Sequence, residues 1–213
     1  LASRVASLDR LSGGRVTLGV GLGALHGNWL AFEADEGRAV RARKLDEVLD
    51  VYAGLMGGQP FSYTGEYFSA SPVTELVPPP PVQTPHPPVW CVGLMVHSRS
   101  RQRSLERAAR WQGVFPAIAG GSLENPGSQL TPPALRELVE RLGALRAEAG
   151  QTMQGYDVVV EGDSHGEFGT VHPPVEQWAD AGATWWVESW WDLPDSPEGR
   201  AELRRRLELG PPR

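Results

Sequence analysis

Short apolar segments alternate with amphipathic helical patterns along almost the whole chain, and this alternation permits few folds. Residues 15–23, RVTLGVGLG, are apolar at their centre, which is typical of a strand covered on both faces. Further strands are predicted at 89–93, 113–116, 157–162 and 184–188. Helices are predicted at 1–11, 37–57, 100–110, 131–150, 175–181 and 196–210. Alternation of this kind produces a parallel sheet, so the fold is α/β, either a doubly wound sheet or a TIM-type barrel.

A long proline-rich insertion, residues 58–88, interrupts this alternation. The four consecutive prolines at 78–81 exclude a helix or a central strand and favour extended polyproline II at the surface. Phe61, Tyr63, Tyr67 and Phe68 are too apolar for a free tether between domains. We therefore predict a loop packed on the body of a single domain that spans residues 1–213, a length typical of one domain.

Charge and composition exclude several function classes. The net charge is −6, whereas nucleic-acid binders carry a basic face. No apolar run reaches the ~18 residues of a membrane span, and Cys91 is the only cysteine, so an intrachain disulfide is excluded. No pair among the histidines has metal-ligand spacing with a third ligand: His26, His86, His97, His165 and His172. We expect a cytoplasmic protein without a metal site, whose partner is a small molecule.

In a TIM barrel the active site lies at the carboxyl ends of the strands, and that rule selects the glycines at the end of the first strand. Gly19, Gly21 and Gly23 lack Cβ atoms, so a ring or a phosphate tail could approach this backbone closely. A tight turn that needs positive φ explains the same glycines equally well. The spacing GxGxG also differs from the dinucleotide fingerprint GxGxxG.

The same rule selects Gly93 and the segment LMVHSRSRQRS at 94–104. Hydroxyl groups of Ser98 and Ser100, guanidinium groups of Arg101 and Arg103, and the N–H groups of a helix start suit a phosphate group. A solvated, arginine-rich helix start is the alternative interpretation of this segment.

Two carboxylates, Glu161 and Glu188, end the last two predicted strands on this side. They are the candidate catalytic residues, because a carboxylate whose pKa is raised by burial can orient a substrate or take a proton. Structural ion pairs with Arg107 or Arg110 are the alternative.

The order of several segments resembles the luciferase-like, flavin-dependent monooxygenase family. The resemblance is carried by LDRLSGGRVTLGVGLG (8–23), RARKLDEVLDVYAGLMGGQPFSYTGEYF (41–68), PPPVQTPHPPVW (79–90), ERAARWQGVFP (106–116), AGATWWVES (181–189) and GPPR (210–213). Members of that family are (β/α)₈ barrels. The resemblance therefore implies a partial TIM-type barrel containing barrel strands four to eight, with about three N-terminal βα units missing.

The resemblance also implies a function. It predicts an oxidoreductase or monooxygenase that uses reduced FMN or the deazaflavin coenzyme F420, with the cofactor phosphate in the 93–104 loop. The alternative is a non-catalytic, truncated barrel that binds flavin weakly or only folds. Because residues 15–23 would form an unguarded sheet edge, we also expect either a homodimer through that edge or an N-terminal helix that covers it.

Overall fold

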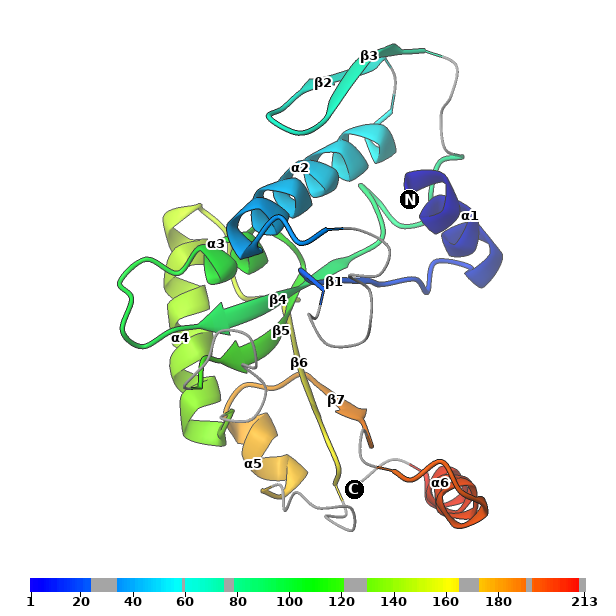
Figure 1. Cartoon of the computed structure of the whole chain (residues 1–213), viewed down its shortest axis with the longest axis vertical. Helices are drawn as coiled ribbons and strands as arrows, with labels where there is room; N and C mark the ends of the chain where they lie inside the picture. The colour runs from blue at the N-terminus through cyan, green and yellow to red at the C-terminus, as the bar shows by residue number, and fades with distance from the viewer. Residues whose placement is uncertain are drawn as a thin grey trace.

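The computed structural model describes residues 1–23, 34–58, 60–74, 79–120, 130–164, 173–190 and 193–210. Its centre is a five-stranded sheet in the order β1-β4-β5-β6-β7, in which all neighbouring strands are parallel (Figure 1). The strands are β1 (Leu18–Val20), β4 (Val89–Met95), β5 (Gly113–Ile118), β6 (Asp157–Gly162) and β7 (Trp185–Glu188).

The spatial order of these strands follows their order in the chain without reversal. A doubly wound sheet reverses its strand order at a switch point, whereas a barrel adds each strand beside the previous one. The structure therefore resolves the two alternatives that the sequence left open. The fold is half of a TIM-type barrel, an open five-stranded sheet with its helices on one side.

The helices lie close to the predicted ranges. They are α1 (Ala2–Ser12), α2 (Arg38–Met56), α3 (Arg103–Arg110), α4 (Pro132–Glu148), α5 (Val175–Asp180) and α6 (Pro197–Leu209). Sequence explains the start of α4, where the Thr131 hydroxyl accepts a hydrogen bond from the Ala134 N–H and Pro132 occupies the first turn. Several predicted bounds differ from the structure. The first strand is Leu18–Val20 rather than 15–23, and the helix predicted from 100 begins at Arg103. The strands predicted at 89–93 and 113–116 continue to Met95 and Ile118.

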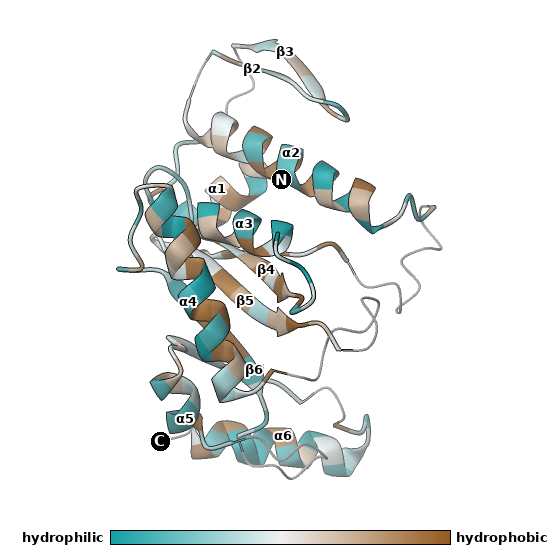
Figure 2. Cartoon of the chain, turned by 90° about the vertical axis from the view of Figure 1, so that its left-hand side faces the viewer, coloured by the Kyte–Doolittle hydropathy of each residue, from teal (hydrophilic) through white to brown (hydrophobic). Residues whose placement is uncertain are grey.

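The hydrophobic core lies between the sheet and its helices. Cys91, Val114 and Val158 point from the strands into this layer and meet buried leucines of α3 and α4. Figure 2 shows the apolar β4 and β5 beside α4, whose surface carries both polar and apolar residues. Burial also raises the pKa of Cys91 to about 12, so its thiol is a neutral packing group.

The opposite face of the sheet, which we call the inner face, carries an aromatic cluster. The Trp90 ring lies 5.7 Å from that of Phe115 and 5.5 Å from that of Trp185. Both indole N–H groups, of Trp90 and of Trp185, donate to the carboxylate of Asp157, at 3.0 and 2.9 Å. The shared acceptor fixes both indoles at the amino-terminal end of the sheet.

The insertion contains a structure that the sequence analysis did not predict. Residues within 58–88 form an antiparallel hairpin of β2 (Phe61–Thr64) and β3 (Ser69–Val73), not only an extended loop. The Glu47 carboxylate on α2 accepts hydrogen bonds from the backbone N–H groups of Glu66, Tyr67 and Phe68 at the turn. In Figure 1 the hairpin lies beside α2, on the side away from the sheet.

The N-terminal helix α1 packs against α2. The carboxylate of Asp9 on α1 accepts hydrogen bonds from the backbone N–H groups of Val82 and Gln83. The carboxylate of Asp9 is fully buried, and these hydrogen bonds outweigh burial and hold its pKa below the usual value. Among the described residues, β4 is the one strand that pairs with β1, so the other edge of β1 has no strand neighbour there. None of the described helices is long and apolar enough to cross a membrane.

Candidate functional site

Because the five strands are parallel, their carboxyl ends meet at one edge, where TIM barrels hold their active sites. The described residues at this edge are Gly21–Gly23 after β1, 96–102 after β4, 119–120 after β5, 163–164 after β6 and 189–190 after β7. His26, His165 and His172 lie outside the described residues.

The glycines within β1 and directly after it have distinct structural roles. A Cβ on Gly21 would lie 3.3 Å from Cγ2 of Val92 on the neighbouring strand, and one on Gly19 would lie 3.6 Å from the Phe115 ring. Gly23 has φ +76°, a left-handed conformation that favours glycine. Packing against Val92 accounts for Gly21, and a turn accounts for Gly23. The approach of a cofactor to this backbone stays a prediction.

Gly93 lies inside β4 rather than after it. A Cβ at this position would lie 2.5 Å from Cγ2 of Val114 and 3.1 Å from Cδ2 of Leu105. The absent side chain therefore lets α3 pack closely on the sheet, and this packing accounts for a glycine without any ligand. Its contact with a cofactor stays a prediction.

Two polar side chains shape the loop after β4. Gln102 is buried, and its amide accepts from the Val96 N–H at 3.0 Å and donates to the carbonyl groups of Val96 and Arg99. Ser104, in the first turn of α3, accepts from the Leu94 N–H and donates to the Val92 carbonyl, both at 3.0 Å. These bonds hold the loop in one conformation, a role that nothing in the sequence pattern signalled.

The predicted phosphate ligands lie on this loop. Ser98, Ser100, Arg101 and Arg103 are all exposed at the sheet edge. The guanidinium group of Arg101 forms an ion pair with Glu106, with a distance of 2.9 Å between Nε and Oε1. Nearby, Nδ1 of His97 lies 3.7 Å from Oε2 of Glu137. The predicted ligands therefore share one exposed segment, with the Arg101 guanidinium group already paired. Their contact with a phosphate group stays a prediction.

Glu161 and Glu188 both lie at the ends of their strands, but they point to opposite faces. Glu161 is exposed on the inner face, where the Ser189 hydroxyl lies 3.3 Å from its Oε2. Glu188 lies on the helix side and accepts hydrogen bonds from the Ser164 N–H at 2.8 Å and the Trp186 indole at 2.9 Å. The two carboxylates do not form a pair.

The electrostatics of Glu188 also differ from the prediction. Burial raises the pKa of its carboxyl, but hydrogen bonds from Trp186 and Ser164 and the charge of Arg206 outweigh burial, so the pKa lies below its usual value. The expected pairing with Arg107 or Arg110 is wrong, because these arginines form ion pairs with Asp46 and Asp50 of α2. At neutral pH Glu188 is therefore a charged hydrogen-bond acceptor and a weak base.

Arg206 of α6 is the residue of this cluster that sequence reasoning missed. Its guanidinium group is buried, donates to the Ser164 hydroxyl at 2.7 Å and lies 3.4 Å from Oε2 of Glu188. Its Nε has no hydrogen-bond partner within the described part of the chain. Arg206 belongs to the run Arg204–Arg206, and no feature of that run indicates which arginine turns inward.

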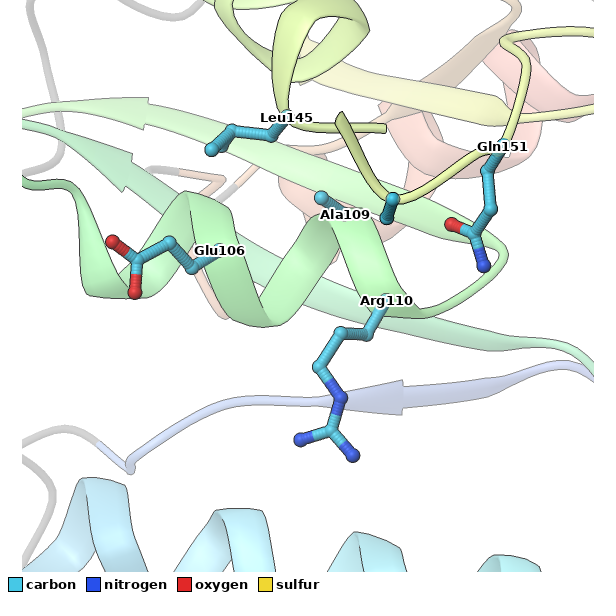
Figure 3. Close-up of a pocket in the computed structure, with 6 residues that line it drawn as sticks. Glu106, Ala109, Arg110, Leu145 and Gln151 are labelled. Atoms are coloured by element: carbon cyan, nitrogen blue, oxygen red, sulfur yellow. The ribbon is translucent and has the colours of Figure 1, made fainter. Parts of the chain in front are cut away.

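A separate hollow of about 320 Å³ lies between α3 and α4, lined by Glu106, Ala109, Arg110, Leu145, Ala149 and Gln151. Figure 3 shows Glu106 and Arg110 pointing away from one another on α3. The residues at the ends of α3 and α4 place the hollow toward the amino-terminal ends of the strands, the side associated with stability in barrels. It is not part of the candidate site.

Among the described residues, no group of three or more His, Cys, Asp or Glu side chains could hold a metal ion.

The comparisons with known proteins agree with the half-barrel fold. The model of the luciferase-like monooxygenase family matches residues 1–165. The chain belongs to the luciferase-like monooxygenase family. An uncharacterized Mycobacterium tuberculosis protein is 30% identical over 152 residues, which cover 71% of this chain and 45% of the relative. The chain thus spans less than half of the length of the curated mycobacterial relatives that it matches.

Solved structures of similar fold include enzymes with two kinds of cofactor. The coenzyme F420-dependent tetrahydromethanopterin reductase from Methanopyrus kandleri has a TM-score of 0.63 and 17% identity, over 94% of this chain and 75% of the reductase. The oxygenating constituent of 3,6-diketocamphane monooxygenase from Pseudomonas putida, in complex with FMN, has a TM-score of 0.54 and 19% identity, over 76% and 43% of the two chains. At such identities the likeness concerns the fold.

Proposed function

We propose that this chain binds FMN or coenzyme F420 through the loop after β4 and contributes to an oxidoreductase or monooxygenase that acts on a small organic molecule. The observation that carries the proposal is the exposed donor set of this loop, at the carboxyl edge of a luciferase-like half-barrel. Ser98, Ser100 and Arg103 offer hydroxyl and guanidinium donors within six residues. Charge-assisted hydrogen bonds of this kind are those that bind phosphate groups strongly.

The glycines after β1 fit the same cofactor. β1 and β4 are neighbours in the sheet, so Gly21 and Gly23 lie beside the loop that carries the donors. A side chain at Gly21 would fill the space next to Val92. The backbone there can therefore approach a bound tail more closely than any other residue type would allow.

The chain's own residues hold and orient the group, while a bound flavin or deazaflavin supplies the hydride or oxygen chemistry. Ser98, Ser100, Arg101 and Arg103 would hold the phosphate, with Gln102 fixing the loop that presents them. The lowered pKa of Glu188 makes its carboxylate a weak base, so a role in proton transfer is disfavoured. Glu161, exposed on the inner face, is the remaining carboxylate candidate for contact with a substrate.

The test is equilibrium binding of FMN and of coenzyme F420, followed by cofactor fluorescence. We expect an Arg101→Ala/Arg103→Ala variant to weaken binding about tenfold or more, because it removes two charged donors. The control is Arg10→Ala/Arg204→Ala, which removes the same charge from exposed positions on α1 and α6. Equal weakening of cofactor binding by both double variants would contradict the assignment of the phosphate site to this loop, since only the net charge would then matter.

A non-catalytic half-barrel is the second candidate, and the open inner face of the sheet favours it. In that case neither cofactor binds at millimolar concentration, and the double variant has no effect to measure. Turnover by this chain alone would contradict this second candidate.

A further inference from the structure

Positively charged side chains converge where the first turn of α2 meets the loop after β4. Arg38 and Arg41 lie in that first turn, and Arg99 lies in the loop. α2 follows β1 in the chain and β1 pairs with β4, so the start of α2 and this loop share the carboxyl edge of the sheet. The first turn of α2 contains no acidic residue, and Gly37 at its N-cap provides no side-chain acceptor. This end of the helix therefore favours an anion.

Arg107 of α3 brings a further guanidinium group to the same place. Its side chain is buried, and its Nη2 donates to the Ala42 carbonyl at 3.0 Å and to Oδ2 of Asp46 at 2.9 Å. Ala42 lies about one helical turn after Arg38, so these bonds hold the Arg107 charge next to the first turn of α2. Figure 1 shows α3 beside this end of α2.

The backbone of Arg99 is fixed within the loop. Its N–H donates to the Val96 carbonyl at 2.9 Å, and its carbonyl accepts a hydrogen bond from the amide of the buried Gln102. Arg99 is exposed, and its guanidinium group forms no ion pair within the described part of the chain. Arg99 therefore offers a positive charge from a fixed position.

The carboxylates of this region do not balance its positive charges. Among the described residues, three carboxylates lie among five cationic side chains: Asp35, Glu36 and Asp46 among Arg38, Arg41, Lys44, Arg99 and Arg107. Burial, followed by the charges of three neighbouring arginines, lowers the pKa of Arg38. Although the whole chain has a net charge of −6, this region is positive and would be stabilised by an anion.

We propose that Arg38, Arg99 and the first turn of α2 form a second anion site, which holds the carboxylates of the oligoglutamate chain of coenzyme F420. The assignment rests on the proposed function, in which the loop after β4 binds the cofactor phosphate. FMN ends at its phosphate group, whereas the phosphate group of F420 continues into a lactyl group and a chain of glutamates. Arg99 lies between Ser98 and Ser100, so a chain that continues past these predicted phosphate ligands comes within reach of Arg99 and α2. Guanidinium groups suit the planar carboxylates of such a chain.

The experiment measures equilibrium binding by cofactor fluorescence with three probes: FMN, F420 without glutamates and F420 with its glutamate chain. We expect the wild type to bind the glutamylated form more tightly than the form without glutamates. Arg38→Gln/Arg99→Gln should weaken binding of the glutamylated form about five- to tenfold and change the other two affinities by less than about twofold. The control Arg10→Gln/Arg43→Gln removes the same charge from α1 and from the side of α2 that faces the hairpin, where Arg43 donates to the Tyr67 hydroxyl.

Circular dichroism verifies that each variant is folded. The proposal is overturned if the glutamates do not change the affinity, if Arg38→Gln/Arg99→Gln weakens binding of all three probes alike, or if the control weakens binding of the glutamylated form equally. The proposed function survives the first of these results, because FMN and F420 still bind. If none of the three probes binds, the phosphate site in the loop after β4 is wrong as well.

Discussion

At the scale of single residues, Gly93 and Gly143 differ in how much space a Cβ atom would have. Gly93 touches Val114 and Leu105, whereas a Cβ on Gly143 of α4 would meet nothing closer than Met153 Cγ at 3.7 Å. We predict that Gly93→Ala lowers the free energy of unfolding by about 1–3 kcal/mol through overpacking. Gly143→Ala should raise it by up to ~1 kcal/mol, because alanine favours a helix. Urea unfolding measures both, and effects of the same sign would contradict the packing role of Gly93.

The lowered pKa of Glu188 predicts how the free energy of unfolding depends on pH. Its pKa is lowered in the folded protein, so its stabilising effect is present above the unfolded value near 4.5 and is lost as the pH falls through the folded value. We predict that Glu188→Gln costs about 1–3 kcal/mol at pH 7, because it weakens hydrogen bonds to a charged acceptor.

The cost of Glu188→Gln should begin to shrink below the unfolded value near 4.5 and shrink further as the pH falls through the lower folded value, where the wild-type carboxyl becomes protonated. Glu161→Gln is the matched control on the next strand and should change stability by less than ~0.5 kcal/mol. Urea unfolding at pH 7 and pH 3.5 measures both variants. A cost for Glu188→Gln that does not vary between these pH values would show that its charge is not involved.

At the scale of elements, apolar runs with clear stops were predictable and the hairpin was not. The strands at 89–95 and 157–162 contain the apolar runs VWCVGLM and VVV, which are typical of parallel strands in an α/β fold. The β2–β3 hairpin alternates apolar and polar residues only over Phe61–Thr64, and prolines surround it. Its turn depends on Glu47, fourteen residues before β2, so local sequence reasoning could not find it.

Glu47 therefore gives a prediction for the hairpin. Its carboxylate accepts three backbone N–H groups at the turn, and these bonds hold its pKa below the usual value against the effect of burial. We predict that Glu47→Ala speeds amide hydrogen exchange across β2 and β3 while the amides of α4 keep their protection. The matched change Glu66→Ala removes an exposed carboxylate at the turn itself and should have little effect. Equal effects would mean that Glu47 does not anchor the turn.

At the scale of the whole molecule, the half-barrel was predictable because βα alternation and the family motifs run through the chain in one order. The candidate site was predictable only in part. The strand-end rule located Glu188 and the loop after β4, since it needs only strand positions. The rule could not supply Arg206, because the inward arginine is set by how α6 lies across the ends of β6 and β7. Gln102 was missed for a similar reason, since its partners are backbone groups of a loop.

The few buried contacts of α6 predict the order in which parts of the molecule unfold locally. The hydrophobic core draws residues from α1 to α5 and the sheet but none from α6, and within α6 only Gly199 and Arg206 are buried. Arg206, with its contacts to Ser164 and Glu188, is therefore the main attachment of this helix. Elements with few buried apolar contacts open at free energies well below that of global unfolding.

Native-state hydrogen exchange should accordingly show α6 opening before β4, β5 and α4. We predict that Arg206→Met speeds exchange in α6 alone and leaves the most protected amides of β4 unchanged. Arg205→Met is the control, because Arg205 is exposed and pairs with Glu202 on the same helix. One common opening free energy for α6 and β4 would mean that α6 is part of the cooperative core.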